Sequence, residues 1–140
     1  MAVFFYGLFM DPQVLERKGV RADDPKVARL EGQRLSIGRR ATLVPDPAEA
    51  VYGILMQVSA DDLGSLYSEA GVRDYRPETV RVILGDGRSV EAVCYILPPP
   101  VERVEPNPAY AAELHSLAIR LGLPEEYLAK IARAGEGHGV

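Results

Sequence analysis

Apolar positions along the 140-residue chain follow two different patterns. In the first two thirds they form short runs separated by Gly, Pro and acidic residues, which is typical of buried strands. In the last third they recur every three or four residues, which is typical of amphipathic helices. The predicted strands cover residues 2–6, 27–37, 41–44, 51–58, 79–84 and 89–97.

Glycines and prolines refine these strands. Gly32 interrupts the second run and predicts a bulge or turn, while Pro45-Asp46-Pro47 predicts the end of the third. The fourth run is the longest near-continuous apolar one in the first half of the chain, so we expect it to be central in a sheet. Gly53 within it indicates a bulge or the close approach of another backbone. Asp86-Gly87, between the last two runs, predicts a hairpin.

Capping residues and spacing predict four helices. Asp11 followed by Pro12 starts a short helix, and Ser59 starts a second one that Gly71 would stop. Pro124 opens the last helix. The third helix is stopped by Gly122 and carries apolar residues at Tyr110, Ala111, Leu114, Leu117, Ala118 and Leu121.

The order of these elements is not the strict alternation of a doubly wound sheet. It predicts an α+β fold with a mixed or curled sheet and flanking helices. A chain of 140 residues, 47% of them hydrophobic, can bury one good core but not two. We therefore expect a single domain over residues 1–140, in which 105–134 form a C-terminal helical extension.

Composition excludes several classes of function. The net charge of −4 and a longest basic run of Arg39-Arg40 argue against nucleic acid as a partner. The apolar N-terminal run is too short for a signal peptide, and no segment reaches the roughly 20 apolar residues of a spanning helix, so we expect a soluble, cytoplasmic protein without a membrane partner. One cysteine, Cys94, and two histidines predict no internal disulfide, no metal site and no Ser-His-Asp triad.

Two stretches carry candidate chemistry. The turn after the first strand, Tyr6 to Met10, leaves backbone N–H groups free to receive an oxygen, although the glycine could serve only to make the bend. Glu69 is predicted in the last turn of the second helix, where the negative end of the helix dipole disfavours an ionised carboxylate. The alternative for Glu69 is an ordinary solvated side chain.

Three motifs, taken in order, resemble the γ-glutamylcyclotransferase-like family, which includes the AIG2-like and butirosin-pathway cyclotransferase proteins. The first motif, Phe5-Tyr6-Gly7-Leu8-Phe9-Met10, is similar to the family's opening Tyr-Gly-Ser/Thr-Leu, and the second is Val51-Tyr52-Gly53-Ile54-Leu55. The third runs from Leu66 to Arg76 and continues in Thr79-Val80-Arg81-Val82. The resemblance covers residues 3–97.

The resemblance implies a small mixed β-barrel with a pocket at the Tyr-Gly loop for a γ-glutamyl group. A family Glu acts there as general acid/base while the substrate's α-amine attacks its own γ-carbonyl, releasing 5-oxoproline and an amine or amino acid without a cofactor. Transferred to this chain, Glu69 carries the proton and the amides of residues 7–9 bind oxygen. The predicted substrate-binding residues are Tyr6, Gly7, Leu8, Phe9, Tyr75 and Tyr95, with Arg76 as a candidate carboxylate clamp.

Two departures from the family pattern leave alternatives open. Ala70, not Glu, directly precedes Gly71, and Leu8 stands where the family has Ser or Thr. One rival is therefore a non-catalytic binding protein that keeps the pocket. Another is an interaction protein that uses the C-terminal helices as a dimer surface. The sequence leaves open which amine the γ-glutamyl group carries and whether the chain forms a homodimer.

Overall fold

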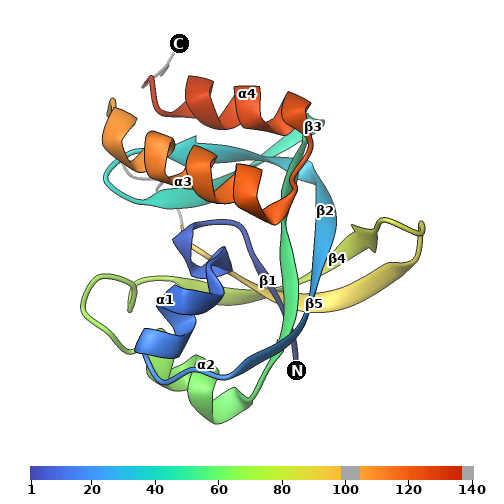
Figure 1. Cartoon of the computed structure of the whole chain (residues 1–140), viewed down its shortest axis with the longest axis vertical. Helices are drawn as coiled ribbons and strands as arrows, with labels where there is room; N and C mark the ends of the chain where they lie inside the picture. The colour runs from blue at the N-terminus through green and yellow to red at the C-terminus, as the bar shows by residue number, and fades with distance from the viewer. Residues whose placement is uncertain (99–104, 137–140) are drawn as a thin grey trace.

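Five strands close into a barrel in the order β1-β3-β2-β4-β5 in the computed structural model, which describes residues 1–98 and 105–136 (Figure 1). The strands are β1 Ala2–Phe5, β2 Ala22–Ile37, β3 Ala41–Val58, β4 Arg76–Leu84 and β5 Ser89–Ile96. Neighbouring strands are antiparallel except β1 and β5, which close the barrel as a parallel pair at Val3 and Val93. The predicted α+β barrel with flanking helices is confirmed.

Strands β2 and β3 form one long, bent hairpin. The register shifts between Glu31 and Gln33, so the bulge predicted at Gly32 is confirmed, and Gly32 has a φ of +84°. The prediction that Pro45-Asp46-Pro47 ends a strand is wrong, because β3 continues to Val58. Pro45 still pairs with Gln33 while Ala50 pairs with Glu31, so residues 46–49 bulge out opposite Gly32, where proline is tolerated.

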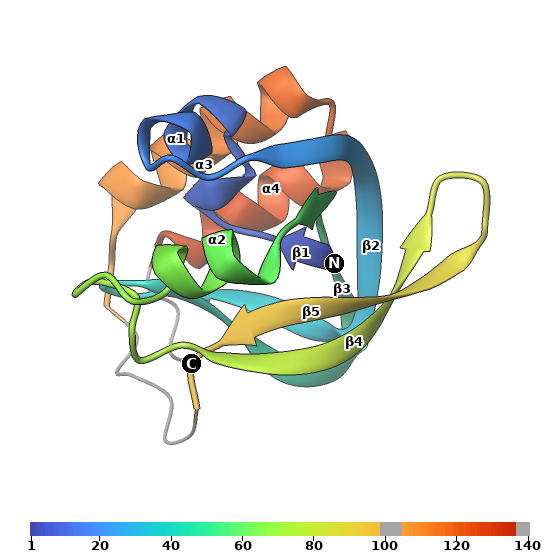
Figure 2. The same ribbon diagram turned by 90° about the horizontal axis from the view of Figure 1, so that it is seen from below.

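Helices cover two regions of the barrel wall. The short helices, η1 Leu8–Met10, α1 Pro12–Arg17 and α2 Ala60–Leu66, lie together, whereas α3 Pro108–Leu121 and α4 Glu125–Ala134 pack on each other beside β2 (Figures 1 and 2). Asp11 accepts a hydrogen bond from the Gln13 N–H and Ser59 accepts one from the Asp62 N–H, which confirms both predicted caps. Gly122 ends α3 in the left-handed conformation, also as predicted.

The second helix is shorter than predicted. It ends at Leu66, not near Gly71, because the Ser68 N–H and hydroxyl both bond to the Ser65 carbonyl, three residues earlier, which tightens the chain out of the α-helical pattern. Residues 67–75 follow as a series of turns that returns the chain to β4. Glu69 therefore lies outside the helix, and the expected effect of the helix dipole on its carboxylate is removed.

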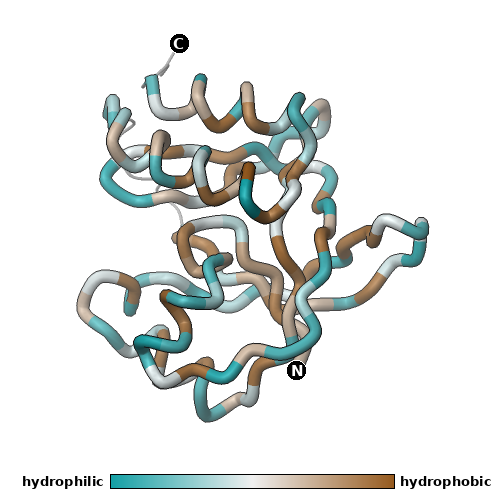
Figure 3. The backbone as a smooth tube through the Cα atoms, viewed as in Figure 1, coloured by the Kyte–Doolittle hydropathy of each residue, from teal (hydrophilic) through white to brown (hydrophobic). Residues whose placement is uncertain are grey.

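The β4–β5 hairpin confirms the Asp86-Gly87 turn, with Gly87 at a φ of +89°. Its tip projects away from the barrel and is hydrophilic (Figure 3). The core includes fully buried side chains from both faces of the barrel wall, among them Val3, Phe4 and Met56 of β1 and β3. β3 lies between β1 and β2, but every strand of a closed barrel has two neighbours, so the prediction of a central strand is not tested by this fold.

Candidate functional site

A cavity of about 220 Å³ lies where the end of β1 meets the turns before β4. Its most buried lining residues are Phe4 and Phe5 of β1 and Tyr6 directly after it, each at most 6% exposed. Its other walls come from the β2–β3 turn, the 67–75 turns and α3. The lining residues are Phe4, Phe5, Tyr6, Gly7, Leu8, Phe9, Arg39, Arg40, Ala41, Tyr67, Gly71, Val72, Tyr75 and Tyr110.

The Tyr-Gly turn lines this cavity and contains two backbone N–H groups without a backbone acceptor among the residues that the structure describes. The Met10 N–H bonds to the Gly7 carbonyl at 3.0 Å and the Asp11 N–H bonds to the Leu8 carbonyl at 3.1 Å, which closes the turn into η1. Within the described part of the chain, the N–H groups of Gly7 and Phe9 have no such backbone acceptor. A Cβ at position 7 would lie 2.9 Å from the Tyr110 hydroxyl, so the cavity wall fits closely around a glycine here.

Aromatic rings form one side of the cavity. Tyr67 stacks on Tyr95 with ring centroids 3.7 Å apart and packs edge-on against Phe9 at 5.7 Å. The Tyr6 hydroxyl donates to the Tyr95 carbonyl at 2.7 Å, which anchors the first strand to the end of β5. These contacts hold the rings in place before any ligand binds.

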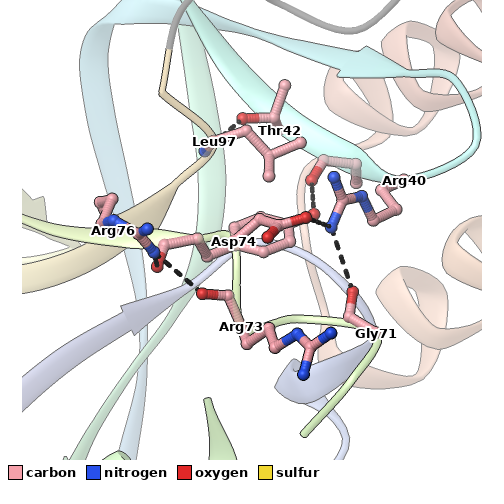
Figure 4. A network of polar contacts seen from close by, with 9 residues as sticks. Arg40, Thr42, Gly71, Arg73, Asp74, Arg76 and Leu97 are labelled. Carbon is pink, nitrogen blue, oxygen red and sulfur yellow. Dashed lines mark hydrogen bonds and ion pairs between the residues drawn. The ribbon is translucent and has the colours of Figure 1, made fainter. Parts of the chain in front are cut away.

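Arg40 and Tyr75 continue the wall beside these rings, with the Tyr75 ring centroid 6.2 Å from that of Tyr67. The Arg40 guanidinium donates to the Gly71 carbonyl at 3.3 Å, pairs with the Asp74 carboxylate at 3.3 Å and lies over the Tyr75 ring (Figure 4). The Tyr75 hydroxyl donates to the Ala41 carbonyl. The 67–75 turns are thus tied to the β2–β3 turn across the cavity.

Glu69 points to a different neighbour. Its Oε1 accepts a hydrogen bond from the Lys18 Nζ at 2.7 Å, and the two side chains are 46% and 33% exposed. Glu69 does not line the cavity, although Gly71 and Val72, two and three residues further on, do. Ala70, at the position of the family Glu, is exposed.

A model of the AIG2-like family matches residues 50–131 of this chain. This is more than half of the 140 residues. The chain belongs to the AIG2-like family. The match runs through α3 and most of α4, so the similarity extends beyond the residues that carry the sequence motifs.

Named relatives of this AIG2-like protein agree with that assignment. It is 27% identical to the γ-glutamylcyclotransferase of Bos taurus over 142 residues, covering 91% of this chain and 75% of the bovine protein. A solved structure named γ-glutamyl cyclotransferase has a TM-score of 0.78 at 24% identity and covers 93% of this chain and 85% of that one. YkqA from Bacillus subtilis has a TM-score of 0.80 at 26% identity, covering 96% of this chain and 54% of YkqA. The predicted γ-glutamylcyclotransferase-like resemblance is confirmed.

The structure brings together most of the predicted site residues. Tyr6, Gly7, Leu8, Phe9 and Tyr75 all line the cavity. Tyr95 lies behind Tyr67 and supports it, and Glu69 lies outside.

Four lining residues with phenol or guanidinium groups, Arg39, Arg40, Tyr67 and Tyr110, were not among the predicted site residues. Tyr110 was expected only as a core position of α3, and Tyr67 only as part of the apolar face of α2. Arg39 and Arg40 were noted only as the longest basic run. For Arg39 and Arg40 the available signal was their position in a connection between two predicted strands, because binding residues occur disproportionately in loops.

The described residues, 1–98 and 105–136, do not form a set of metal ligands. No group of three or more His, Cys, Asp or Glu side chains there is placed to hold an ion. In the same ranges, no helix is both long and apolar enough to cross a membrane.

Buried phenols make the fold sensitive to alkali. Burial raises the pKa of Tyr110 to about 12, and it also raises the pKa values of Tyr6, Tyr67 and Tyr127 above the ordinary value of 10. The folded state therefore holds these protons above pH 10, where the unfolded chain releases them. Their contribution to stability is complete below pH 10 and declines as the pH rises toward 12.

We expect the free energy of unfolding to change little with these groups from pH 7 to 9 and to fall steeply above pH 10. Each phenol contributes a slope of up to about 1.4 kcal/mol per pH unit. Urea unfolding at pH 8, 10 and 11 measures how the free energy of unfolding falls with pH. Tyr110→Phe removes one of the buried phenols and should reduce that fall by up to about 1.4 kcal/mol per pH unit. A stability that stays constant up to pH 11.5 would contradict this.

Proposed function

We propose that this AIG2-like protein is a γ-glutamyl cyclotransferase acting in the cavity at the Tyr-Gly turn. The α-amine nitrogen of the substrate forms a bond to its own γ-carbonyl carbon, and the bond from that carbon to the leaving amine breaks. The proton lost by the attacking amine ends on the leaving amine. The products are 5-oxoproline and a free amine or amino acid.

The observation that carries this proposal is the pair of free amides on the cavity wall. The Gly7 and Phe9 N–H groups lack backbone acceptors among the described residues, so they are available to the developing oxyanion or to the substrate carboxylate. At about 220 Å³ the cavity is smaller than the roughly 300–1,000 Å³ of pockets for drug-sized ligands. A small metabolite head group suits it better than a large ligand.

Ring closure needs little further machinery. Nucleophile and carbonyl belong to one molecule, and well-oriented intramolecular reactions reach effective molarities of ~10⁵–10⁸ M. The rings of Phe9, Tyr67 and Tyr75 are held in place by contacts among themselves and with β5, so they are suited to selecting a folded substrate shape. Neither a metal nor a cofactor is required by this reaction.

We assign the proton transfer to Glu69. To reach the substrate its carboxylate must exchange the Lys18 ammonium for the substrate's α-ammonium, a group of the same charge and chemistry. The Lys18–Glu69 pair is partly exposed, and pairs of this kind contribute only about 0–1 kcal/mol. The exchange therefore costs little compared with the gain from general acid/base catalysis.

The second candidate is a non-catalytic binding protein for the same class of ligand. One observation favours it: within the described part of the chain, no Asp or Glu lines the cavity. A protein of this kind would hold the γ-glutamyl group through the amides and rings but would release it unchanged.

The test is to incubate the protein with a panel of γ-glutamyl amino acids and γ-glutamylamines and to measure 5-oxoproline by mass spectrometry. We expect turnover of at least one compound. Val72→Trp, which places a large ring in the cavity, should abolish it. Absence of 5-oxoproline across the panel would refute the enzymatic proposal, and calorimetric binding that Val72→Trp removes would then establish the binding protein.

A further inference from the structure

Arg39 and Arg40 stand side by side in the cavity wall but differ in what they contact. They lie in the turn between β2 and β3, which is held by a Gly38 N–H bond to the Arg40 carbonyl at 3.1 Å. The Gly38 carbonyl in turn accepts from the Asn107 side chain at 2.8 Å, just before α3. The turn is therefore anchored to two elements, and the arginines project from a fixed base.

The Arg40 side chain is held by contacts within the protein. Its guanidinium binds the Gly71 carbonyl and the Asp74 carboxylate and covers the Tyr75 ring, and its side chain is only 21% exposed (Figure 4). Its charge is largely neutralised by Asp74. Arg40 is thus a brace between two walls, with little capacity left for a ligand.

Arg39 differs from Arg40 in its exposure and in its contacts. It lines the same cavity and is exposed, and its guanidinium makes no hydrogen bond or ion pair with any residue that the structure describes. No carboxylate of the described chain lines the cavity to balance it. An uncompensated, planar guanidinium with five donors is suited to a carboxylate.

The burial of the lining residues indicates which part of a bound ligand would lie near Arg39. The Phe5 and Tyr6 side chains at the floor are almost completely buried, whereas Arg39 and Gly71 are exposed at the opening. A γ-glutamyl group bound at the amides of the Tyr-Gly turn therefore directs its leaving group outward, past Arg39.

We propose that Arg39 binds a carboxylate on the leaving group, so that the site selects γ-glutamyl amino acids over γ-glutamylamines. This inference rests on the proposed site for the γ-glutamyl group. It names Arg39 as a specificity-determining residue and the leaving amino acid's carboxylate as the group recognised. The protein carries a net charge of −4, so the selection comes from this local guanidinium and not from the overall charge.

The test uses two compounds that differ only in that carboxylate, γ-L-glutamyl-L-alanine and γ-L-glutamylethylamine. We expect kcat/KM for the alanine compound to exceed that for the ethylamine compound by roughly 10-fold, the size of one partly exposed charge-assisted hydrogen bond. Arg39→Gln should bring the ratio close to one by slowing the alanine compound alone. Arg39→Lys, which keeps the charge but not the planar fork, should give an intermediate ratio.

Arg73→Gln is the matched control. Arg73 is also exposed and follows the lining residue Val72, but it does not itself line the cavity. It should leave the ratio unchanged. An equal loss of preference in Arg73→Gln and Arg39→Gln would show a general charge effect and overturn the assignment of Arg39, as would a wild-type ratio of one.

Binding measurements separate this inference from the proposed activity. If neither compound yields 5-oxoproline, the enzymatic proposal fails, and calorimetry on the same two compounds tests Arg39 alone. Tighter binding of the alanine compound by wild type, lost in Arg39→Gln, would support the role of Arg39 without turnover. Equal affinities, or no binding of either compound, would overturn it.

Discussion

Replacing Glu69 with Gln is expected to lower kcat for 5-oxoproline formation by ~10²–10⁴-fold, the usual contribution of one general acid/base group. The amide has nearly the shape of the carboxylate but cannot accept the proton of the attacking amine. Because Glu69 would pair with the substrate's α-ammonium in place of Lys18, the affinity for substrate should also fall, by about the 0–1 kcal/mol of a partly exposed ion pair. Single-turnover kinetics with γ-L-glutamyl-L-alanine and calorimetric binding of the same compound measure the two effects separately.

Lys18 provides the complementary variant. If Glu69 must leave Lys18 to act, Lys18→Gln removes the competitor and should raise kcat by up to about fivefold, the equivalent of the roughly 1 kcal/mol in an exposed ion pair. Lys26→Gln is the matched control, because Lys26 also forms an exposed pair, with Asp24, away from the cavity. It should leave kcat unchanged.

Other outcomes would reassign the proton transfer. Unchanged turnover in Glu69→Gln would leave the cyclisation in place but exclude Glu69 as the proton carrier. A loss of activity in Lys18→Gln as large as that in Glu69→Gln would show that the pair acts by holding the 67–75 turns in position.

Gly53→Ala is expected to destabilise the fold by about 3 kcal/mol or more, at the upper end of the range for overpacking a core. A Cβ at position 53 would lie 2.2 Å from the Phe5 carbonyl oxygen and 2.9 Å from the Phe4 ring. The first of these atoms belongs to the backbone of β1, which is paired with β3 along its length, so it cannot move aside without breaking the ladder. Urea unfolding followed by circular dichroism measures the change.

Gly64→Ala is the control for this substitution. Gly64 is an exposed position of α2, and a Cβ there would meet nothing within 4 Å. Alanine should stabilise the helix by roughly 0.5–1 kcal/mol, since it is the better helix former. A Gly53→Ala protein as stable as wild type would show that β1 and β3 are not packed as closely as described. Because Phe4 and Phe5 line the cavity, the same variant should also weaken ligand binding.

Features that depend on neighbouring residues were predicted well. The caps at Asp11 and Ser59, the hairpin at Asp86-Gly87 and the stop at Gly122 each involve hydrogen bonds or backbone angles within a few residues. The bulge at Gly32 belongs to the same class. Such features are encoded locally, so the sequence predicts them without knowledge of the rest of the fold.

Two predicted boundaries were wrong, the first because of non-local strand pairing and the second because of the turns that follow the helix. The Pro45-Asp46-Pro47 segment was expected to end a strand, but the barrel places it in a bulge opposite Gly32, where missing N–H donors cost little. The second helix was expected to continue toward Gly71, yet its end is set by local bonds at Leu66 and by the turns that carry the chain back to β4.

By itself, the sequence determined the class of fold, the strand and helix signals and the family resemblance, and it predicted the Tyr-Gly turn as the candidate site. Only the tertiary structure decided what surrounds that turn. Barrel closure brings Arg39, Tyr67 and Tyr110, from three segments far apart in the chain, to one cavity, and it leaves Glu69 against Lys18 outside it. The reason is physical: spacing along the chain predicts local geometry, whereas the direction of a side chain at a rim depends on which strands pair and in which register.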